Sequence, residues 1–215
     1  MSNPLRTSPL KRLRFAPVAL LAGIFAAVLL SLSLTGTLSG FAASITNSSN
    51  TAASGTLIMQ EQNANASVTC LSTDGGSVST NSATCSTINK FGGSTTMTPG
   101  NTVNTPITIK NTGTAAANTF TLTPGAACTQ TANGTSNGTA TDLCAKMNLV
   151  ITSGSTTVFS GTLASFKGAA AISLPTAPAA GASVPFNFAV TLDSSAGNTY
   201  QGLAASVPMT WTFTA

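Results

Sequence analysis

Apolar side chains recur at every second position in two segments near the carboxyl end of the chain, with small or polar residues between them. The apolar positions of the first segment are Phe186, Phe188, Val190 and Leu192, and those of the second are Val207, Met209, Trp211 and Phe213. Successive side chains of a β-strand point to opposite faces, so this period predicts strands with one buried face. The chain is therefore constrained to a fold built from sheets, and we expect Trp211 to pack in the core between two of them.

The rest of the sequence favours the same secondary structure. Ile107 and Ile109, then Phe120 and Leu122, repeat the alternation on both sides of 110–114, which we interpret as a hairpin-like connection. Weaker strand patterns, separated by turn signals, cover 55–62, 66–71, 84–91, 146–152, 156–165 and 170–174. About nine or ten short strands, with no amphipathic helix beyond the leader, predict an all-β, two-sheet antiparallel sandwich of jelly-roll or immunoglobulin-like type over residues 55–215.

The amino end of the chain has the layout of a secretory signal peptide. Four basic residues precede an apolar run at 15–34, and small residues follow it. A cut before Gly40 or before Ala43 would place small residues at the positions that a signal peptidase reads. An uncleaved anchor is the competing interpretation, since about 20 apolar residues can span a bilayer. We expect residues 1–39 to be a helical signal peptide that is removed on export.

Residues 40–54 differ from both the leader and the sandwich. Phe41 and Ile45 are the only large apolar residues in this segment, which is otherwise small or polar. The composition predicts an extended N-terminal arm ahead of the first strand.

Four cysteines in an exported chain indicate disulfides rather than a metal site. Cys70 and Cys85 bracket one polar stretch, and Cys128 and Cys144 bracket another. Four cysteines allow three connectivities, of which we expect the local one, Cys70 with Cys85 and Cys128 with Cys144. Zinc bound by four thiolates would need more closely spaced pairs.

The distribution of charge excludes nucleic acid as a partner. Charged residues make up 6% of the chain, against about 25% in an ordinary soluble domain. Beyond residue 39 the chain carries four lysines and four acidic residues, so the basic excess belongs to the leader alone. A neutral domain has no electrostatic footprint for DNA, RNA or an anionic membrane.

Few residues could carry catalytic chemistry. The chain has no histidine, which excludes Ser-His-Asp systems and His-ligated zinc. Its acidic residues after the leader are Glu61, in a predicted strand, and Asp74, Asp142 and Asp193, for which turn roles are sufficient. A glycosidase would need two of them across a cleft, and their spacing does not suggest it. Ser165 and Lys167 form no SxxK motif. We therefore predict no enzyme, no catalytic residue, no metal and no cofactor.

Several short segments, in this order, resemble the TasA/camelysin family of secreted proteins. They are Gly40-Phe41 after the signal run, the stretch 53–57, Met97-Thr98-Pro99-Gly100-Asn101-Thr102-Val103, the stretch 107–113 ending in Asn111-Thr112-Gly113, and Asn198-Thr199-Tyr200-Gln201-Gly202. The resemblance implies a jelly-roll-like sandwich, a leader cut by a signal peptidase of SipW type, and export to the extracellular matrix or cell surface of a bacterium. Camelysin members have been classed as metallopeptidases, but this chain offers no matching ligand set.

The resemblance also implies subunits that polymerise into matrix fibres, each lending its N-terminal segment as a strand to its neighbour. An extended peptide can satisfy the unpaired groups of an exposed sheet edge while its alternate side chains fill pockets. The arm at 40–54 is the candidate donor, with Phe41 and Ile45 as its anchors on one face. Its partners would be further copies of the chain, with other matrix or cell-envelope components. The alternative function is a monomeric cell-envelope adhesin or ligand-binding sandwich.

Overall fold

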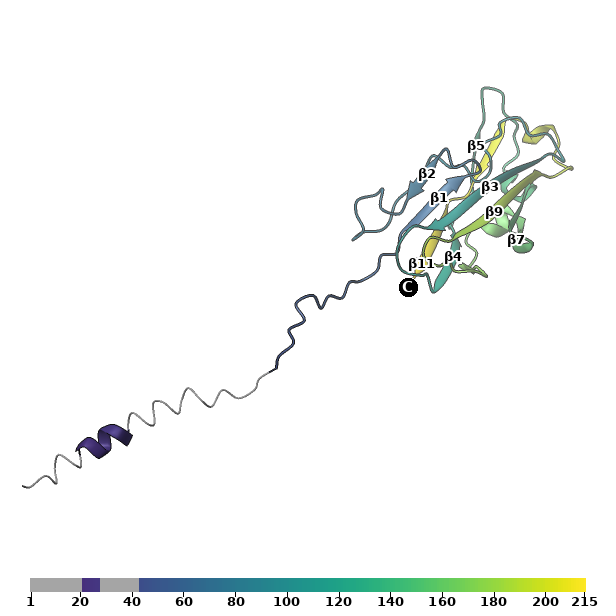
Figure 1. Ribbon diagram of the computed structural model, residues 1–215. Coiled ribbons are helices and arrows are strands. Elements are labelled where there is room, and N and C mark those ends of the chain that lie inside the picture. Colours follow the sequence, from purple (N-terminus) through teal and green to yellow (C-terminus); the bar gives the residue numbers. More distant parts are fainter. Residues whose placement is uncertain (1–20, 28–42) are drawn as a thin grey trace, which may run out of the picture. The chain divides into compact units, whose positions relative to one another are not determined.

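The computed structural model of the protein describes residues 21–27 and 43–215 (Figure 1). The chain divides into two compact units, Met1–Ala52 and Ala53–Ala215. In the first unit, residues 21–27 are α-helical, while residues 43–52 contain no strand and are exposed. Most of the predicted signal peptide, and Phe41 with it, lies outside the described residues. None of the helices in the described part of the chain is long and apolar enough to cross a membrane.

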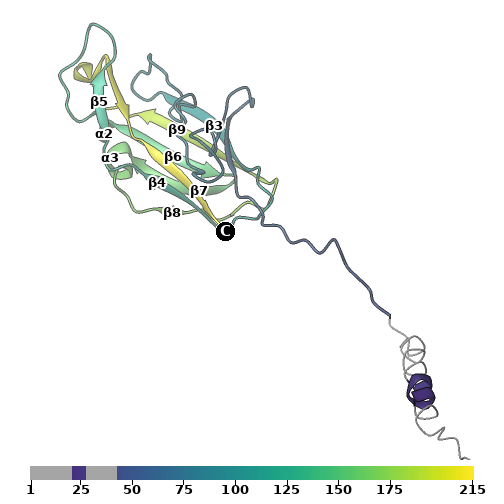
Figure 2. The ribbon, with the colours of Figure 1, turned by 90° about the vertical axis from the view of Figure 1, so that its left-hand side faces the viewer.

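The second unit is an all-β sandwich of antiparallel sheets, which confirms the predicted fold class; the jelly-roll type stays a prediction. The six-stranded sheet has the order β2-β1-β3-β9-β6-β7, and Figure 2 shows β3, β9 and β6 within it. Its strands are β1 (Met59–Asn63), β2 (Thr69–Leu71), β3 (Thr102–Asn111), β6 (Met147–Ser153), β7 (Thr156–Thr162) and β9 (Ser183–Leu192).

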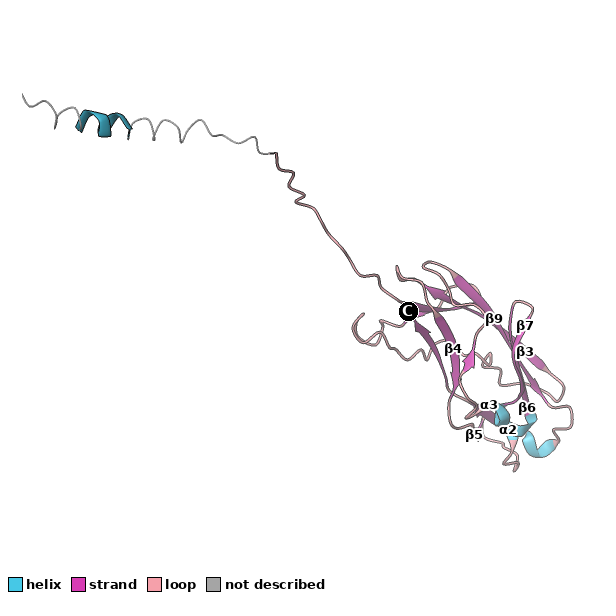
Figure 3. Ribbon diagram, turned by 90° about the horizontal axis from the view of Figure 1, so that it is seen from below, coloured by secondary structure: helices cyan, strands magenta, loops and turns pink. Residues whose placement is uncertain are grey.

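Two smaller sheets complete the fold. A three-stranded sheet has the order β11-β4-β8, and a two-stranded sheet pairs β10 with β5. Their strands are β4 (Thr119–Pro124), β5 (Thr129–Ala132), β8 (Ile172–Ser173), β10 (Leu203–Ser206) and β11 (Met209–Thr214). The short helices are α2 (Leu143–Lys146), α3 (Leu163–Phe166) and the 3₁₀ turn η1 (Asn198–Tyr200). Figure 3 shows the two layers, with β4 in one and β3, β6, β7 and β9 in the other.

The core lies between the six-stranded and three-stranded sheets. Strand β9 contributes every second residue, as its sequence predicts, with Phe188 completely buried. Strand β4 contributes Phe120 and Leu122 from the opposite side. Phe120 meets Phe186 of β9 edge to face at a centroid distance of 5.8 Å, an arrangement that aromatic pairs prefer. Period-two alternation therefore determines which face of each strand is buried.

Two prolines lie inside long strands of the six-stranded sheet. Proline lacks the N–H that a ladder needs, and it is therefore usually confined to edges and bulges. Pro106 of β3 lies one residue past Ile107, the last residue that pairs with β1. Pro185 of β9 likewise lies beyond Asn187, where pairing with β6 ends. At each proline one of the two neighbouring strands has therefore stopped, while the pairing between β3 and β9 continues.

The predicted hairpin at 110–114 is wrong. Strand β3 pairs with β1 and β9, whereas β4 pairs with β11 and β8, so the connection crosses from one sheet to the other. The crossing is organised by Asn111, which is completely buried. Its amide donates to the carbonyl oxygens of Ala115, at 2.8 Å, and Pro178, at 3.2 Å, and accepts from Gly113 N–H at 3.0 Å. A local pattern that is typical of a hairpin also fits a sheet-to-sheet crossover.

Other predicted boundaries also differ from the structure. The segment 84–91 contains no strand, because Ile88 and Phe91 are three residues apart and pack from a loop that turns at Asn89. The predicted strand 156–165 ends at Thr162, where α3 begins. Thr162 and Ser165 form a capping box, with Thr162 Oγ1 accepting from Ser165 N–H at 3.1 Å. Strands β5 and β10, which are short and poor in large apolar residues, were not predicted.

Candidate functional site

Strand β11 is an edge strand whose outer backbone groups are unpaired. It forms the end of the three-stranded sheet and pairs only with β4. The carbonyl of Pro208 accepts from Gly125 N–H at 2.7 Å, which identifies this position as a hydrogen-bonded pair of the ladder. Such pairs alternate in antiparallel ladders. The backbone groups of the threonines of β11 therefore face β4, and those of Met209, Trp211 and Phe213 face outward, without a backbone partner among the described residues.

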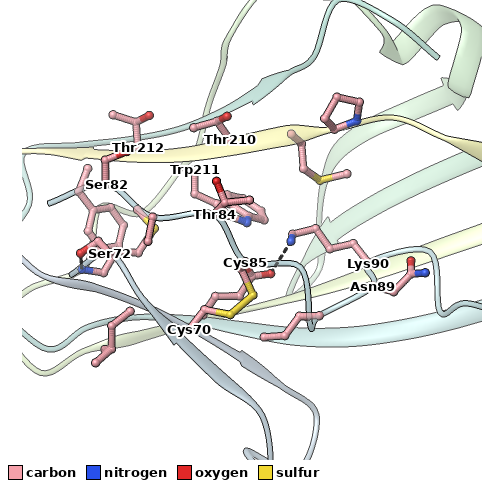
Figure 4. Close-up of a pocket in the computed structure, with 18 of the residues that line it drawn as sticks. Cys70, Ser72, Ser82, Thr84, Cys85, Asn89, Lys90, Thr210, Trp211 and Thr212 are labelled. Carbon is pink, nitrogen blue, oxygen red and sulfur yellow. Dashed lines mark hydrogen bonds and ion pairs between the residues drawn. A yellow bond between two sulfur atoms is a disulfide. The ribbon is translucent and has the colours of Figure 1, made fainter. Parts of the chain in front are cut away.

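A groove of about 740 Å³ lies beside this edge (Figure 4). We call it the β11 groove. One wall is formed by residues 206–213. The other walls come from β1, from β2, and from the segment that follows β2, represented by Met59, Cys70 and Thr84. The six-stranded sheet extends through β1 to β2, whereas the three-stranded sheet stops at β11. The groove therefore lies between the edge strand β11 and strands β1 and β2 of the larger sheet.

Trp211 stands between the two sheets, as predicted, but it is not fully buried. Its ring lies 4.8 Å from the ring of Phe186 and 6.2 Å from that of Phe188, both on β9. Phe120 of its own sheet is 5.6 Å away. The remaining surface of the indole lines the groove. Trp211 is thus both a core residue and part of the groove wall.

The segment 72–91, which we call the groove loop, forms a second wall. The disulfide between Cys70 and Cys85 ties it to β2. Asn81 donates to the carbonyl of Leu57 at 2.6 Å and accepts from Ser72 Oγ at 2.5 Å. Ile88, buried in the core, anchors its carboxyl end. The loop is therefore fixed at both ends, which keeps the groove open.

A charge pair crosses the groove between β1 and the groove loop. Lys90 Nζ lies 2.7 Å from Glu61 Oε1, and only 11% and 8% of the two side chains are exposed. Glu61 shares the inward face of β1 with Met59, which also lines the groove. A charge buried to this extent requires a partner. The sequence suggested Glu61 only as a candidate catalytic carboxylate. The ion pair was not predicted, although a charged residue on the apolar face of a strand is a signal for one.

One buried side-chain nitrogen in the groove lacks a hydrogen-bond partner. Among the described residues, the indole Nε1 of Trp211 is buried without an acceptor. Glu61 Oε1, in contrast, is paired with the ammonium group of Lys90. Figure 4 shows the Trp211 nitrogen and the Lys90 ammonium group in the same part of the groove. The groove therefore combines apolar walls with one polar spot that is incompletely satisfied.

A second cavity, of about 430 Å³, lies under β10. About half of its lining is apolar, represented by Met97, Leu143, Met147 and Leu203, and the lining includes no charged residue. Cavities of this size and character are typical of small-molecule sites.

The remaining acidic residues have structural roles: Asp74 and Asp193 stabilise turns, as predicted, whereas the side chain of Asp142 bonds a distant tyrosine. Asp74 Oδ2 accepts from Leu71 N–H at 2.7 Å and so caps its own turn. Asp142 accepts from the Tyr200 hydroxyl at 2.7 Å, and this hydrogen bond raises the pKa of Tyr200. Asp193 accepts from Ser195, which lowers the pKa of that carboxyl.

The other sequence candidates do not assemble into a catalytic site. Ser165 is engaged in the capping box, and Lys167 is exposed. No group of three or more histidine, cysteine, aspartate or glutamate side chains lies close enough to hold a metal within residues 21–27 and 43–215. Cys128 and Cys144 form the second disulfide, so the predicted local connectivity is confirmed at both sites. Ile45 of the arm is 91% exposed.

Comparison with protein-family models and with curated protein sequences finds no match for this chain.

Proposed function

We propose that the protein is a secreted structural subunit of an extracellular surface fibre or biofilm matrix. In this proposal the arm of one copy, residues 40–54, adds as a strand to the free edge of β11 in the next copy. The observation that carries the proposal is the unpaired edge of β11 beside an open groove. Such an edge is a template for another strand, because an added peptide satisfies its N–H and C=O groups.

The arm matches the groove in length and pattern. Six residues of β11 span about 20 Å at roughly 3.4 Å per residue, and the stretch 41–47 provides seven residues. Phe41, Ala43 and Ile45 share one face of an extended chain, as Met209, Trp211 and Phe213 do on β11. Ile45 is almost fully exposed in the structure and would be buried at such a junction. Burying both anchors would contribute roughly 3–6 kcal/mol before ordering costs.

The charge balance is consistent with self-association. After the leader the chain has four lysines and four acidic residues, so copies would not repel one another through net charge. The same balance provides no attraction for nucleic acid. Backbone pairing and apolar side chains would then determine the affinity of each junction.

The proposal includes export and processing. Removal of the leader by a signal peptidase of SipW type would leave Phe41 near a free amino terminus, at the end that must enter the groove. The protein would then act at the cell surface or in the matrix, together with other envelope components, and without a cofactor or a catalytic residue.

The test compares filament formation in four forms of the protein, expressed from the full-length sequence: wild type, Phe41→Ser, Ile45→Ser and a deletion of 40–54. We expect filaments for wild type only, with the thermal unfolding of the monomeric variants unchanged. A Thr46→Ser variant, altered on the opposite face of the arm, is the matched control and should still assemble.

Two outcomes would contradict the proposal. Filaments that persist in the deletion would show that the arm is not the donor. A deletion that unfolds the monomer would show that the arm is an ordinary strand of its own sandwich.

A monomeric adhesin or ligand-binding sandwich is the second candidate, and the cavity under β10 favours it. It predicts a wild-type protein that stays monomeric at all concentrations and binds small apolar probes such as anilinonaphthalene sulfonate. Partial filling of the cavity by Ala205→Leu would abolish that binding.

A further inference from the structure

The cavity under β10 is surrounded by a small hydrophobic core of its own. Leu143 of α2, Leu192 of β9 and Ala196 are buried and form a cluster distinct from the main core. The partly buried side chains that pack against this cluster are Met97, Met147, Tyr200, Leu203 and Ala205. Every one of these residues also lines the cavity. The second core therefore encloses a space of about 430 Å³ instead of filling it.

The sequence of β10 explains why this space is open. The side chains of β10 and β11 that pack against the two cores occur at every second position: Leu203, Ala205, Val207, Met209, Trp211 and Phe213. Ala205 is the only small side chain in this series, and it lines the cavity. Unfilled apolar space in a core lowers stability, so a bound molecule that contacts these side chains would stabilise this end of the sandwich. Figure 3 shows α2, β5 and β6 together at that end.

The cavity is apolar where it is deepest and polar where it opens. Its buried lining residues are apolar, represented by Leu143, Leu163 and Leu192. Asn198 and Gln201, in contrast, are exposed and lie at the opening, where Gln201 Nε2 donates to Asn198 Oδ1 at 3.2 Å. Side-chain amides can both donate and accept hydrogen bonds. The opening can therefore bind an uncharged polar group, while the buried end contacts an apolar one.

The lining also determines the charge and shape of a ligand. It includes no charged residue, and an ionised group buried without a partner is costly. The aromatic ring of Tyr200 lines the cavity, while its hydroxyl is bonded to Asp142. Aromatic rings pack well against such a face. Met97 and Met147 have flexible side chains, which adapt to the shape of what they contact.

We propose that the cavity under β10 binds an uncharged small molecule, with an apolar, ring-containing body that lies against Leu143 and a polar group that stays at the opening near Gln201. Its volume is within the range of known ligand sites. The inference goes beyond the proposed function. The site uses no residue of the arm, so it is present in an assembled chain as well as in a monomer.

Methionine methyl groups can report which space a probe occupies. Met97 and Met147 line the cavity under β10, whereas Met59 and Met209 line the β11 groove. Protein expressed from the full-length sequence is labelled with ¹³C at its methionine methyl groups and titrated with N-phenyl-1-naphthylamine, an uncharged aromatic probe. The fluorescence of the probe gives the affinity. Anilinonaphthalene sulfonate, which has the same rings and an added sulfonate, is the matched charged probe.

We expect N-phenyl-1-naphthylamine to shift the methyl resonances of Met97 and Met147 and to leave those of Met59 and Met209 unchanged. Anilinonaphthalene sulfonate should bind at the same site roughly tenfold more weakly, because its sulfonate has no counter-charge there.

A substitution at Ala205 tests the location independently. Ala205→Leu, which reduces the cavity, should weaken binding of the uncharged probe by roughly tenfold or more. Ala170→Leu is the control, because Ala170 is exposed and lines neither the cavity nor the β11 groove. The methyl measurement on the wild-type protein needs no substitution, so it holds if Ala205→Leu folds poorly.

Three results would overturn the proposal. Shifts confined to Met59 and Met209 would place the probe in the β11 groove. Absence of a shift in all four methyl groups would show that the cavity does not bind such molecules. Equal or tighter binding of the sulfonate would contradict the requirement for an uncharged ligand. Filaments are not measured in this experiment, so the fibre proposal and the ligand site can each fail without the other.

Discussion

Lys90 Nζ lies 2.7 Å from Glu61 Oε1, and the pair joins the groove loop to strand β1 beneath the β11 groove. Both side chains are largely withdrawn from water, so each needs the other. The chain has few charged residues, and two of them form this pair at the wall of the groove rather than at the outer surface.

Lys90→Met should destabilise the protein by about 3 kcal/mol, because it leaves the carboxylate of Glu61 buried without a counter-charge. The free energy of unfolding in urea measures the effect. Lys167→Met, which alters an exposed lysine, is the control and should change stability by less than about 0.5 kcal/mol. The double variant Glu61→Leu with Lys90→Met should recover most of the loss. A double variant as unstable as Lys90→Met alone would contradict this account.

Replacing Cys70 and Cys85 by serine should lower stability by roughly 3 kcal/mol and also weaken filament formation, because the disulfide holds the groove loop in place. Replacing Cys128 and Cys144 is the matched comparison, since that disulfide closes a loop of nearly equal length away from the groove. Loss of this second disulfide should lower stability by a similar amount. Filament formation should nevertheless stay intact at temperatures at which both variants are folded. Equal effects of the two pairs on assembly would argue against a role for the groove loop.

Gly113→Ala should destabilise the crossover between the sheets by more than about 2 kcal/mol. A Cβ at this position would lie 2.2 Å from the carbonyl oxygen of Thr56 and 2.8 Å from the backbone nitrogen of Ile58, neither of which can move freely. Gly197→Ala is the control, because a Cβ there meets no atom within 4 Å. Thermal unfolding of the two variants measures the difference in stability. Similar melting temperatures would show that the crossover can adjust to the added Cβ, which would contradict the prediction.

Tyr200 should make stability decline at alkaline pH. Its hydrogen bond to Asp142 raises the pKa of the phenol above its ordinary value of 10.0. A group whose pKa is raised by folding contributes stability that is fully present below pH 10 and is lost as the pH rises through the folded pKa. Tyr200 is the only tyrosine, so phenolate absorbance follows it without ambiguity. Asp142→Asn should lower the measured pKa towards its ordinary value; an unchanged titration would contradict the assignment.

Local sequence pattern accounts for much of the sandwich. The alternation in β9 and β11 predicted which side chains are buried, the spacing of the cysteines predicted both disulfides, and the turn at Asp74 was predicted to cap itself. Each of these properties depends on residues close together in the chain. The interactions that produce these properties therefore form between residues of one short segment, which is why the sequence alone predicts them.

Segments with ambiguous patterns were assigned less well. The stretch 84–91 has strand-forming residues but packs as a loop, because Cys85 and Ile88 are held by distant partners. The apolar residues Leu163 and Phe166 continue the pattern of β7, yet they form a helical turn capped by Thr162. In both cases a tertiary contact or a cap outweighed the intrinsic preference of the chain.

The sequence by itself therefore determined the all-β class, the inward face of the long strands, the cysteine pairs and the neutral charge of the chain after residue 39. Only the tertiary structure decided that β3 and β4 belong to different sheets, that β11 is left without a second neighbour, and that Lys90 meets Glu61 beside Trp211. The physical reason is that alternation identifies the buried face of a strand but carries no information about which strand lies beside it. Strand neighbours are set by long-range pairing and packing, so a free edge and its groove exist only once the whole sandwich has formed.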